Sequence, residues 1–392
     1  MRLIDNIWKM YFLKAIMWFM VAMPIIVIFF QNHGLSLTEV MILQSVYSLT
    51  VALFEIPSGY IADLFGRKNT IIFSTFFCFI GYLIFSNYSD FYIFCLAEVF
   101  VGIGGSLMSG SDSALMYDTL LESDSKDEYT KVEGRSYAIG NFSEASAAIL
   151  GGILATYSIL LPVYVQTIIL FFGIPIAFTL KETTGFKKNP IKRSSDGMLH
   201  IIKYVFNDSI LKWLIVFSSI IGMATLSIAW LAQPIFNLLE IPIVYFGIIW
   251  AILNVSAGFT SFNSHIIEKK INNKYKLLIT LSILIVISFL SIAFLDNIII
   301  LFFILIIYLI RGILTPIMKT YINNYAPSNK RATILSIRSF IIRIMFAITA
   351  PLLGLLNDSY SLNYSFYFLS IILAICILIP LYNLKSFNVS NS

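Results

Sequence analysis

The stretch Glu55-Ile-Pro-Ser-Gly-Tyr-Ile-Ala-Asp-Leu-Phe-Gly-Arg-Lys68 is the most informative part of this chain. It leaves an apolar segment, 37–62, through Asp63, turns at Gly66 and enters a second apolar segment at about residue 69. Glycine suits such a turn because it has no side chain to clash in unusual backbone conformations. The stretch therefore predicts a short, charged loop between two helices at a membrane surface.

The composition is that of a membrane protein with many spans. Of the 392 residues, 58% are hydrophobic and 12% are charged, and the mean hydropathy is +0.87. Soluble domains carry roughly 25% charged residues. The apolar segment that follows residues 1–9 has no small-residue cleavage site, so we expect it to be a span and not a signal peptide. Cys78, Cys95 and Cys376 lie in apolar segments without paired spacing, which predicts neither disulfides nor a metal site.

Apolar segments of spanning length recur twelve times along the chain. A helix needs about 20 mostly apolar residues to cross a bilayer. We therefore predict an all-α membrane protein with twelve transmembrane helices in two six-helix, pseudo-symmetric halves, 1–180 and 209–392, joined by a cytoplasmic linker, 181–208. The spans are expected at about 9–31, 37–62, 69–88, 91–118, 134–157, 161–180, 210–236, 243–265, 276–295, 298–321, 332–356 and 362–384.

Among the loops, lysine and arginine occur only in alternate ones, which predicts the orientation. By the positive-inside rule, both termini and the linker are expected in the cytoplasm. The loop charges account for the net charge of +5, so no nucleic-acid partner is inferred. Frequent isoleucine and asparagine are typical of an AT-rich bacterial genome, and we expect a multi-pass protein of a bacterial inner membrane. The basic loops contain Arg67, Lys68, Lys126, Lys131, Lys181, Lys187, Lys188, Lys192, Arg193, Lys203, Lys269, Lys270, Lys274, Lys276, Lys330 and Arg331.

Several ionisable residues fall inside the predicted spans. Each costs about 2.5–3.5 kcal/mol to insert, so each is a functional candidate. Glu144, Arg311 and Arg343 come at similar depth near the middle of spans five, ten and eleven, which predicts a central cavity that contacts substrate or a proton. A buried structural ion pair between Glu144 and one arginine is an equal alternative. Glu98 and Asp112 of span four are further cavity candidates, although the glycines around them also indicate close helix packing.

Three lysines lie nearer the ends of their spans. Lys14, Lys212 and Lys319 are placed within about a turn of the cytoplasmic face, where a lysine side chain can snorkel to water. We expect no functional role for them. Among the many aromatic side chains, only Trp230 and Trp250 are assigned to a substrate pocket.

The pattern Gly59-x-x-x-Asp63-x-x-Gly66-Arg67-Lys68 resembles the loop between helices 2 and 3 of the major facilitator superfamily of transporters. The twelve spans and the linker extend this resemblance to the whole chain. It implies that Gly59 lets helix 2 approach helix 11. It also implies that Asp63 faces the positive amino-terminal end of helix 11, which holds the inner side closed.

The chain also departs from patterns of that family. Where drug:proton antiporters have an arginine in helix 4, this chain has Glu98, and where they have Gly-Pro in helix 5 it has Ala147-Ala148. Leu64 replaces a basic residue that often follows the aspartate. The phrase Glu55-Ile-Pro-Ser-Gly59 is nonetheless similar to bacterial drug-efflux-like members, and it favours efflux.

Depth along the helices predicts one further ion pair. Glu55 lies eight residues before Asp63, a rise of about 12 Å, and Arg338 lies about 9 Å into helix 11. If helices 2 and 11 pack as they do in the family, these two charges meet and help to close the inner side. The predicted inner gate consists of Glu55, Gly59, Asp63, Gly66, Arg67, Lys68 and Arg338.

The resemblance implies a secondary active transporter that alternates access around a midplane site. We expect an antiporter that performs proton-coupled efflux of amphiphilic compounds, acting as a monomer in the lipid bilayer without cofactors or metals. The alternative is a carrier, importer or exporter, of an anionic or zwitterionic metabolite such as a siderophore, amino acid or peptide, which Arg311 and Arg343 favour.

Other classes fit the sequence less well. An intramembrane enzyme needs a catalytic constellation inside the bilayer, whereas His33, His200 and His265 fall in loops or at span ends. An ATP-driven pump needs a phosphate-binding loop of the Gly-x-x-x-x-Gly-Lys-Ser/Thr type, which the sequence does not contain. A channel remains an open alternative, but no repeated pore-lining motif favours it.

Overall fold

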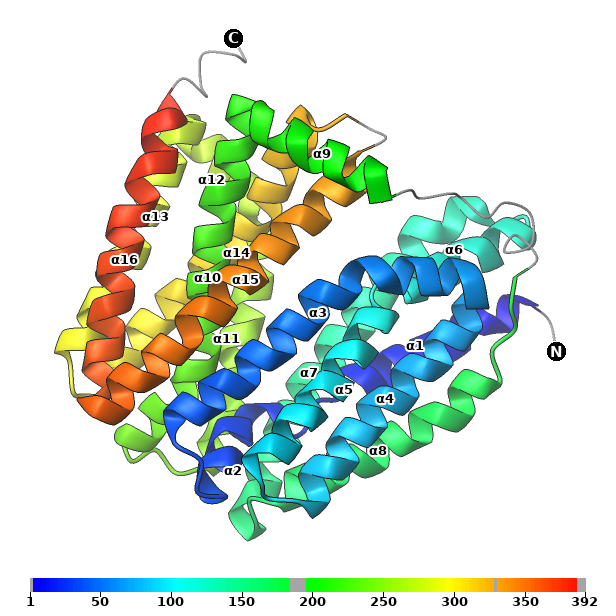
Figure 1. The fold of residues 1–392 in the computed structure, drawn as a ribbon, viewed down its shortest axis with the longest axis horizontal. Coiled ribbons are helices and arrows are strands. Elements are labelled where there is room, and N and C mark those ends of the chain that lie inside the picture. Colours follow the sequence, from blue (N-terminus) through cyan, green and yellow to red (C-terminus); the bar gives the residue numbers. More distant parts are fainter. Residues whose placement is uncertain (1–2, 184–194, 328–329, 386–392) are drawn as a thin grey trace. The chain divides into compact units, whose positions relative to one another are not determined.

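The computed structural model describes residues 3–183, 195–327 and 330–385, which form helices joined by short connections (Figure 1). No strand occurs in these ranges, and they contain twelve helical spans that are long and apolar enough to cross a membrane. The predicted all-α fold with twelve spans is therefore confirmed. The predicted and observed ends of the spans differ by at most five residues. The largest difference is at the start of α7, which begins at Tyr129 and not at the predicted 134.

Contacts divide the chain into two compact units. Unit 1 comprises Met1–Gly34, Val46–Arg193 and Pro242–Ala251, and unit 2 comprises Leu35–Ser45, Ser194–Ile241 and Ile252–Ser392. The first turns of α3 thus pack in unit 2, and the start of α11 packs in unit 1. The predicted halves, 1–180 and 209–392, remain a proposal about domains. Part of the predicted linker, 184–194, lies outside the described residues.

Unit 1 combines long helices of spanning length with shorter helical pieces. In it α4 lies against α5 and α8, and α1 lies against α6, α7 and α8 (Figure 1). The helices are η1 (Leu3–Asp5), α1 (Asn6–Trp18), η2 (Met23–Ile25), α2 (Ile26–Asn32), α3 (Leu37–Phe65), α4 (Arg67–Asn87), α5 (Phe91–Met108), α6 (Ser111–Glu122), η3 (Lys126–Glu128), α7 (Tyr129–Tyr157) and α8 (Leu161–Phe178).

Unit 2 is organised around α10, which packs against α14, α15 and α16. The helix α9 packs against the same unit through α10 and α15, and there the Lys330 ammonium lies 4.5 Å from the centroid of the Tyr204 ring. The helices are α9 (Ser195–Asn207), α10 (Ser209–Leu238), α11 (Val244–Phe262), α12 (Ser264–Ile271), α13 (Lys274–Phe294), α14 (Ile300–Tyr325), α15 (Arg331–Ser359) and α16 (Leu362–Asn383).

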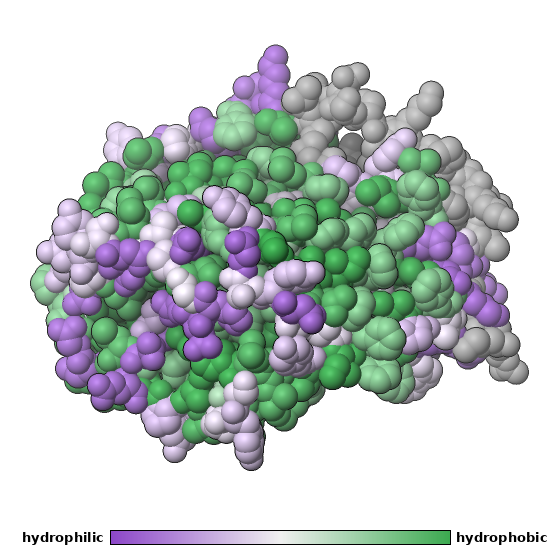
Figure 2. Space-filling view, turned by 60° about the horizontal axis from the view of Figure 1, so that its bottom comes forward, coloured by the Kyte–Doolittle hydropathy of each residue, from purple (hydrophilic) through white to green (hydrophobic). Residues whose placement is uncertain are grey.

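The surface carries large apolar side chains, as a lipid-facing surface requires. On α8, for example, Ile168, Phe171 and Phe172 are each more than half exposed. Figure 2 shows a face on which apolar residues, in green, surround patches of polar ones in purple. Water penalises such exposure and a hydrocarbon layer does not, so the surface agrees with a multi-pass membrane protein.

Two spans of unit 1 are interrupted near their middle. The first span leaves helical geometry between Trp18 and Met23, and the fourth leaves it at Ser109 and Gly110. Gly110 has a φ of 84°, in the left-handed region that favours glycine. In a bilayer, irregular backbone is tolerated only where protein buries it or where it lines a cavity. The two breaks therefore indicate where a binding site could lie in unit 1.

Candidate functional site

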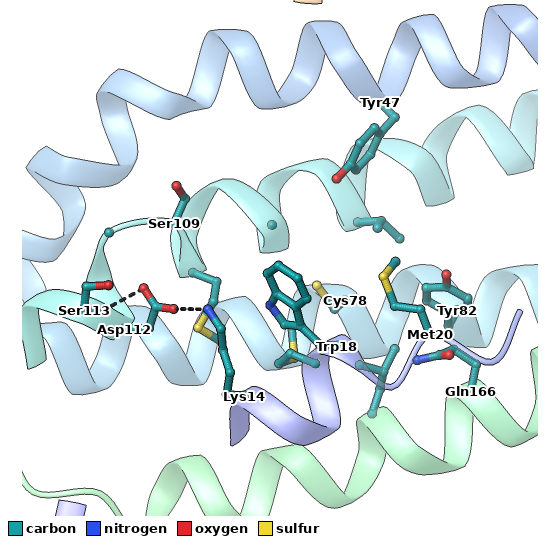
Figure 3. A pocket seen from close by; sticks show the side chains of 16 residues that line it. Lys14, Trp18, Met20, Tyr47, Cys78, Tyr82, Ser109, Asp112, Ser113 and Gln166 are labelled. Carbon is teal, nitrogen blue, oxygen red and sulfur yellow. Dashed lines mark hydrogen bonds and ion pairs between the residues drawn. The ribbon is translucent and has the colours of Figure 1, made fainter. Parts of the chain in front are cut away.

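A cavity of about 470 Å³ lies within unit 1, and both helix breaks contribute to its wall (Figure 3). Trp18 and Met20 come from the first break, and Ser109 and Gly110 come from the second. The volume falls in the range of about 300–1,000 Å³ that is typical of small-molecule sites. Discontinuous spanning helices commonly build the substrate sites of transporters, so this cavity is the candidate site.

A glutamine of α8 stabilises the first break. The backbone N–H of Val21 donates to Gln166 Oε1 over 2.6 Å. Gln166 is itself buried, with 1% of its surface exposed. An N–H without a partner in hydrocarbon costs several kcal/mol, on the order of a lost hydrogen bond. The Gln166 side chain therefore allows the chain to leave helical geometry beside the cavity.

The cavity holds an ion pair between α1 and α6. Lys14 Nζ lies 2.9 Å from Asp112 Oδ2, and their side chains are 17% and 10% exposed. The second oxygen, Asp112 Oδ1, accepts the backbone N–H of Ser113 over 2.8 Å. Figure 3 shows the Lys14 and Asp112 side chains meeting at one end of the cavity, next to Ser113. A pair this enclosed is much less screened by solvent than a surface pair.

Helical spacing explains why Lys14 points to α6. Ile7, Met10 and Tyr11 of α1 are buried in one apolar cluster with Leu115 of α6. Lys14 follows Tyr11 by three residues and Ile7 by seven, which places it on the same face of the helix. Burial of that apolar stripe therefore turns the ammonium inward.

The predicted snorkelling of Lys14 is wrong. It lies eight residues after the start of α1, a rise of about 12 Å, and it makes an ion pair in a cavity instead of reaching for the membrane surface. The depth of a residue in its span does not give the direction in which its side chain points. The sequence does not single out Trp18 or Gln166 either, although a proline at 24 in an apolar segment signals a helix break.

Methionine and aromatic side chains also line the cavity. Met17, Met20 and Met108 line the cavity, and Tyr47 reaches into it from α3 (Figure 3). The ammonium of Lys14 lies 4.9 Å from the ring centroid of Trp18, so this ring already has a cation near its face. Methionine and aromatic surfaces adapt to apolar bodies of different shape. The cavity thus combines methionine, aromatic and aliphatic surfaces with hydroxyl and amide groups, one carboxylate and one ammonium group.

A second ion pair of unit 1 lies at the turn between α3 and α4. The predicted turn is confirmed, because α3 ends at Phe65 and Gly66 has a φ of 90°. Arg67 forms an ion pair with Asp118 of α6 and donates to the Ala114 carbonyl. Glu182 accepts the backbone N–H groups of Arg67 and Lys68 over 3.2 and 2.9 Å. These bonds cap the amino-terminal end of α4.

Other members of the predicted inner gate stay predictions. The side chain of Asp63 lies outside the described residues. Glu55 and Gly59 belong to unit 1, whereas Arg338 belongs to unit 2, where it donates to Ser218 Oγ. The proposed contact between Glu55 and Arg338 is therefore untested.

The predicted cavity residues fall in different places. Asp112 lines the cavity. Glu98 is 5% exposed in α5 but is not part of the cavity wall, and Glu144 of α7 is half-buried outside it. Arg311 and Arg343 lie in α14 and α15 of unit 2, so their convergence with Glu144 stays a prediction. The guanidinium of Arg311 lies 5.7 Å from the Tyr308 ring centroid.

Two further predictions concern tryptophans and metals. Trp230 and Trp250 are buried, with 8% and 4% exposure, and neither lines the unit 1 cavity. Within the described ranges no group of three or more histidine, cysteine or acidic side chains has the arrangement of a metal site.

Sequence comparisons relate the chain to transporters. The profile of the Major Facilitator Superfamily matches residues 7–341. An uncharacterized MFS-type transporter, YxaM, of Bacillus subtilis is 25% identical over 91% of this chain and 89% of its own length. An uncharacterized transporter of Buchnera aphidicola is 29% identical over 41% of this chain, and the match spans only 40% of that relative.

Solved structures show a similar fold. The nucleoside transporter NupG matches with a TM-score of 0.81 at 10% identity, over 98% of this chain and all of that one. A D-xylose-proton symporter matches with a TM-score of 0.70 at 13% identity, over 98% of this chain and 96% of that one. At these identities the likeness concerns the fold alone.

Proposed function

Because the chain belongs to the major facilitator superfamily of secondary carriers, we propose that it exports amphiphilic compounds that carry a cationic group, by proton-coupled antiport. The substrate site in this proposal is the cavity of unit 1. The observation that carries it is the ion pair between Lys14 and Asp112, which stands beside the Trp18 ring in a cavity that methionine and aromatic side chains also line.

The cavity chemistry supports a cationic amphiphile. A substrate cation can replace the Lys14 ammonium at Asp112, because the two carry the same charge and need the same acceptor. The face of Trp18 adds a cation–π contact of about 0.5–2 kcal/mol. The methionine and tyrosine side chains then cover the apolar part of the substrate. Each part of such a molecule therefore meets a matching surface.

Proton coupling follows from the same charges in this proposal. A proton and an organic cation both neutralise a carboxylate, so binding of one weakens binding of the other. Entry of protons down their gradient then drives the cation out. The substrate leaves by alternating access, and Glu55, Gly59, Asp63, Gly66, Arg67, Lys68 and Arg338 form the inner gate. From the basic loops we expect both termini in the cytoplasm of a bacterial cell, and we expect a monomer.

A second candidate is a carrier of zwitterionic or anionic metabolites. The observation that favours it is that Lys14 and Asp112 lie 2.9 Å apart, so a zwitterion can separate them and bind both. The cations Arg311 and Arg343 of unit 2 add to this alternative. An amino acid or a small peptide has the matching pair of charges.

Transport into proteoliposomes separates the two candidates. The purified chain is reconstituted, a pH gradient is imposed, and accumulation is compared for ethidium, the dipeptide Ala-Phe and uridine. We expect ethidium to accumulate against its gradient, and we expect Asp112→Asn to abolish this. Asp127→Asn is the control, because Asp127 is exposed on η3. Preference for the dipeptide supports the second candidate, and ethidium accumulation that ignores the pH gradient contradicts proton coupling.

A further inference from the structure

A second carboxylate, Glu133, lies next to the ion pair of the cavity. It stands in the second turn of α7, one residue after the buried Val132 and three before the buried Ser136. Residues three and four apart share a helix face, so Glu133 lies beside the face of α7 that packs against α1 and α6. It is not itself part of the cavity wall.

Ser113 connects the two carboxylates. Its backbone N–H donates to Asp112 Oδ1 over 2.8 Å, and its hydroxyl donates to Glu133 Oε1 over 2.7 Å. Ser113 also lines the cavity. Ser113 therefore links the two carboxylates, and a change in charge at Asp112 alters the electrostatic environment of Glu133.

The hydrogen bonds of the two carboxylates differ in kind. Asp112 has an ammonium and an amide N–H as donors. Glu133 has one neutral hydroxyl, and its Oε2 atom is buried with no hydrogen-bond partner among the described residues. A buried charge that lacks donors is costly, and binding of a proton removes that charge. Glu133 is therefore the carboxyl group of the two that has fewer donors around it.

A proton on Glu133 would balance the charges of this cluster. With Glu133 protonated, Lys14, Asp112 and Glu133 together carry no net charge. The helix α8 and the segment η2, which also pack against α7, contain no charged residue. Near Glu133, Tyr11 of α1 interacts with Arg135 of α7 and Glu128 of η3, and Tyr129 of α7 interacts with Tyr117 of α6.

We propose that Glu133 is the residue that carries the coupling proton, while Asp112 binds the substrate cation. When the cation displaces Lys14 from Asp112, the cluster gains one positive charge. Glu133 then releases its proton to water, and its carboxylate restores the balance. One proton leaves for each cation that enters, and no covalent bond other than the O–H bond changes. This inference rests on the proposed function, because it needs a cationic substrate and proton coupling.

Infrared difference spectroscopy tests the proton site without any substrate. When the pH of the purified protein in detergent is raised, a protonated carboxyl group loses its carbonyl band as it ionises. We expect the wild type to show such a band and Glu133→Gln to lack it. Glu128→Gln, at an exposed position five residues away, is the control and should keep it. An unchanged band in Glu133→Gln overturns the assignment, whatever the substrate is.

Transport then tests the role in coupling. In proteoliposomes that contain Glu133→Gln, we expect exchange of labelled for unlabelled ethidium at equal pH to continue, within about threefold of wild type. We expect accumulation driven by the pH gradient to fall at least tenfold. Retained exchange also shows that the variant folds. Full gradient-driven accumulation by Glu133→Gln contradicts the inference, whereas a wild type that ignores the gradient contradicts the proposed function itself.

Discussion

Two aspartates of α6, six residues apart, form ion pairs in very different surroundings. Asp112 meets Lys14 in the cavity, where the side chains are 10% and 17% exposed. Asp118 meets Arg67 at the turn between α3 and α4, where the side chains are 16% and 26% exposed. Arg67 is further held by the Ala114 carbonyl, whereas Lys14 has the Trp18 ring beside it.

The ion pair of Lys14 and Asp112 can exchange partners with a ligand, whereas the ion pair of Arg67 and Asp118 stabilises a turn. The groups around Arg67 are backbone atoms and a capping carboxylate, and any change there alters the folded structure. The groups around Lys14 are side chains that border empty volume, so a ligand can take its place. A charged group in a spanning helix is therefore best judged by what lies next to it, and depth alone is a poor guide.

The largest expected effect comes from exchanging the charges within each pair. In the double variant Lys14→Asp with Asp112→Lys, the carboxylate moves to α1 and loses its hydrogen bond from the Ser113 amide. Transport should fall about 100-fold, because two charge-assisted hydrogen bonds worth roughly 1.5–3 kcal/mol each are rearranged. In Arg67→Asp with Asp118→Arg, transport per folded molecule should stay within a few fold. Ethidium uptake normalised to protein that elutes as a monodisperse peak measures both.

Equal losses of transport in the two exchanged variants would contradict the distinction between the two ion pairs. Full transport by the variant in which the cavity pair is exchanged would also contradict it, because a carboxylate on α1 would then bind the substrate as well as one on α6.

The next effect concerns the ring beside Lys14. Trp18→Leu removes the aromatic face and keeps an apolar side chain, so the KM for ethidium should rise about tenfold, the equivalent of roughly 1.4 kcal/mol. The maximal rate should change less. The measurement is the initial rate of uptake over a range of ethidium concentrations, and Trp8→Leu serves as control because Trp8 is 68% exposed. A KM that does not move removes Trp18 from the substrate site.

A smaller effect is expected at the turn. Arg67→Gln removes the ion pair with Asp118 and the bond to the Ala114 carbonyl, which should lower the stability of the fold by about 1–2 kcal/mol. The KM for substrate should not change, because Arg67 is not part of the cavity wall. Thermal unfolding in detergent gives the first quantity and uptake gives the second. A raised KM with unaltered stability would give the turn a direct role in binding.

The smallest effect is expected from the cap of α4. Glu182→Gln keeps an acceptor for the N–H groups of Arg67 and Lys68 but removes the charge, so stability should fall by about 0.5–1 kcal/mol. The loss should shrink at high salt, which screens charges that are partly exposed. Unfolding curves at low and high salt measure this, and a loss that does not depend on salt would argue for a purely geometric role.

The spans and the turn could be predicted from sequence because each follows from a local constraint. A bilayer requires a helix of defined length, and within it every backbone group must find a partner. Gly66 was predictable because a tight turn between two charged helix ends needs a residue that tolerates positive φ.

The site could be predicted only in part, because it depends on which helices meet. The charge of Asp112 inside a span identifies it as a candidate. The role of its partner Lys14 cannot be predicted, since nothing local shows that α1 and α6 share an apolar cluster. Glu133 falls in a predicted loop, because α7 begins five residues earlier than the sequence predicts. The spacing of Ile7, Tyr11 and Lys14 was the one available signal for an inward-facing lysine.

The strongest test of Asp112 as the residue that binds the substrate cation gives the two aspartates of α6 the same substitution. The dissociation constant of ethidium is measured in detergent, by the change in its fluorescence, for wild type, Asp112→Asn and Asp118→Asn. We expect Asp112→Asn to bind ethidium at least tenfold more weakly, whereas Asp118→Asn should stay within about twofold of wild type. Equal affinities for the two variants, or a greater loss in Asp118→Asn, would contradict the assignment of the cavity as the substrate site.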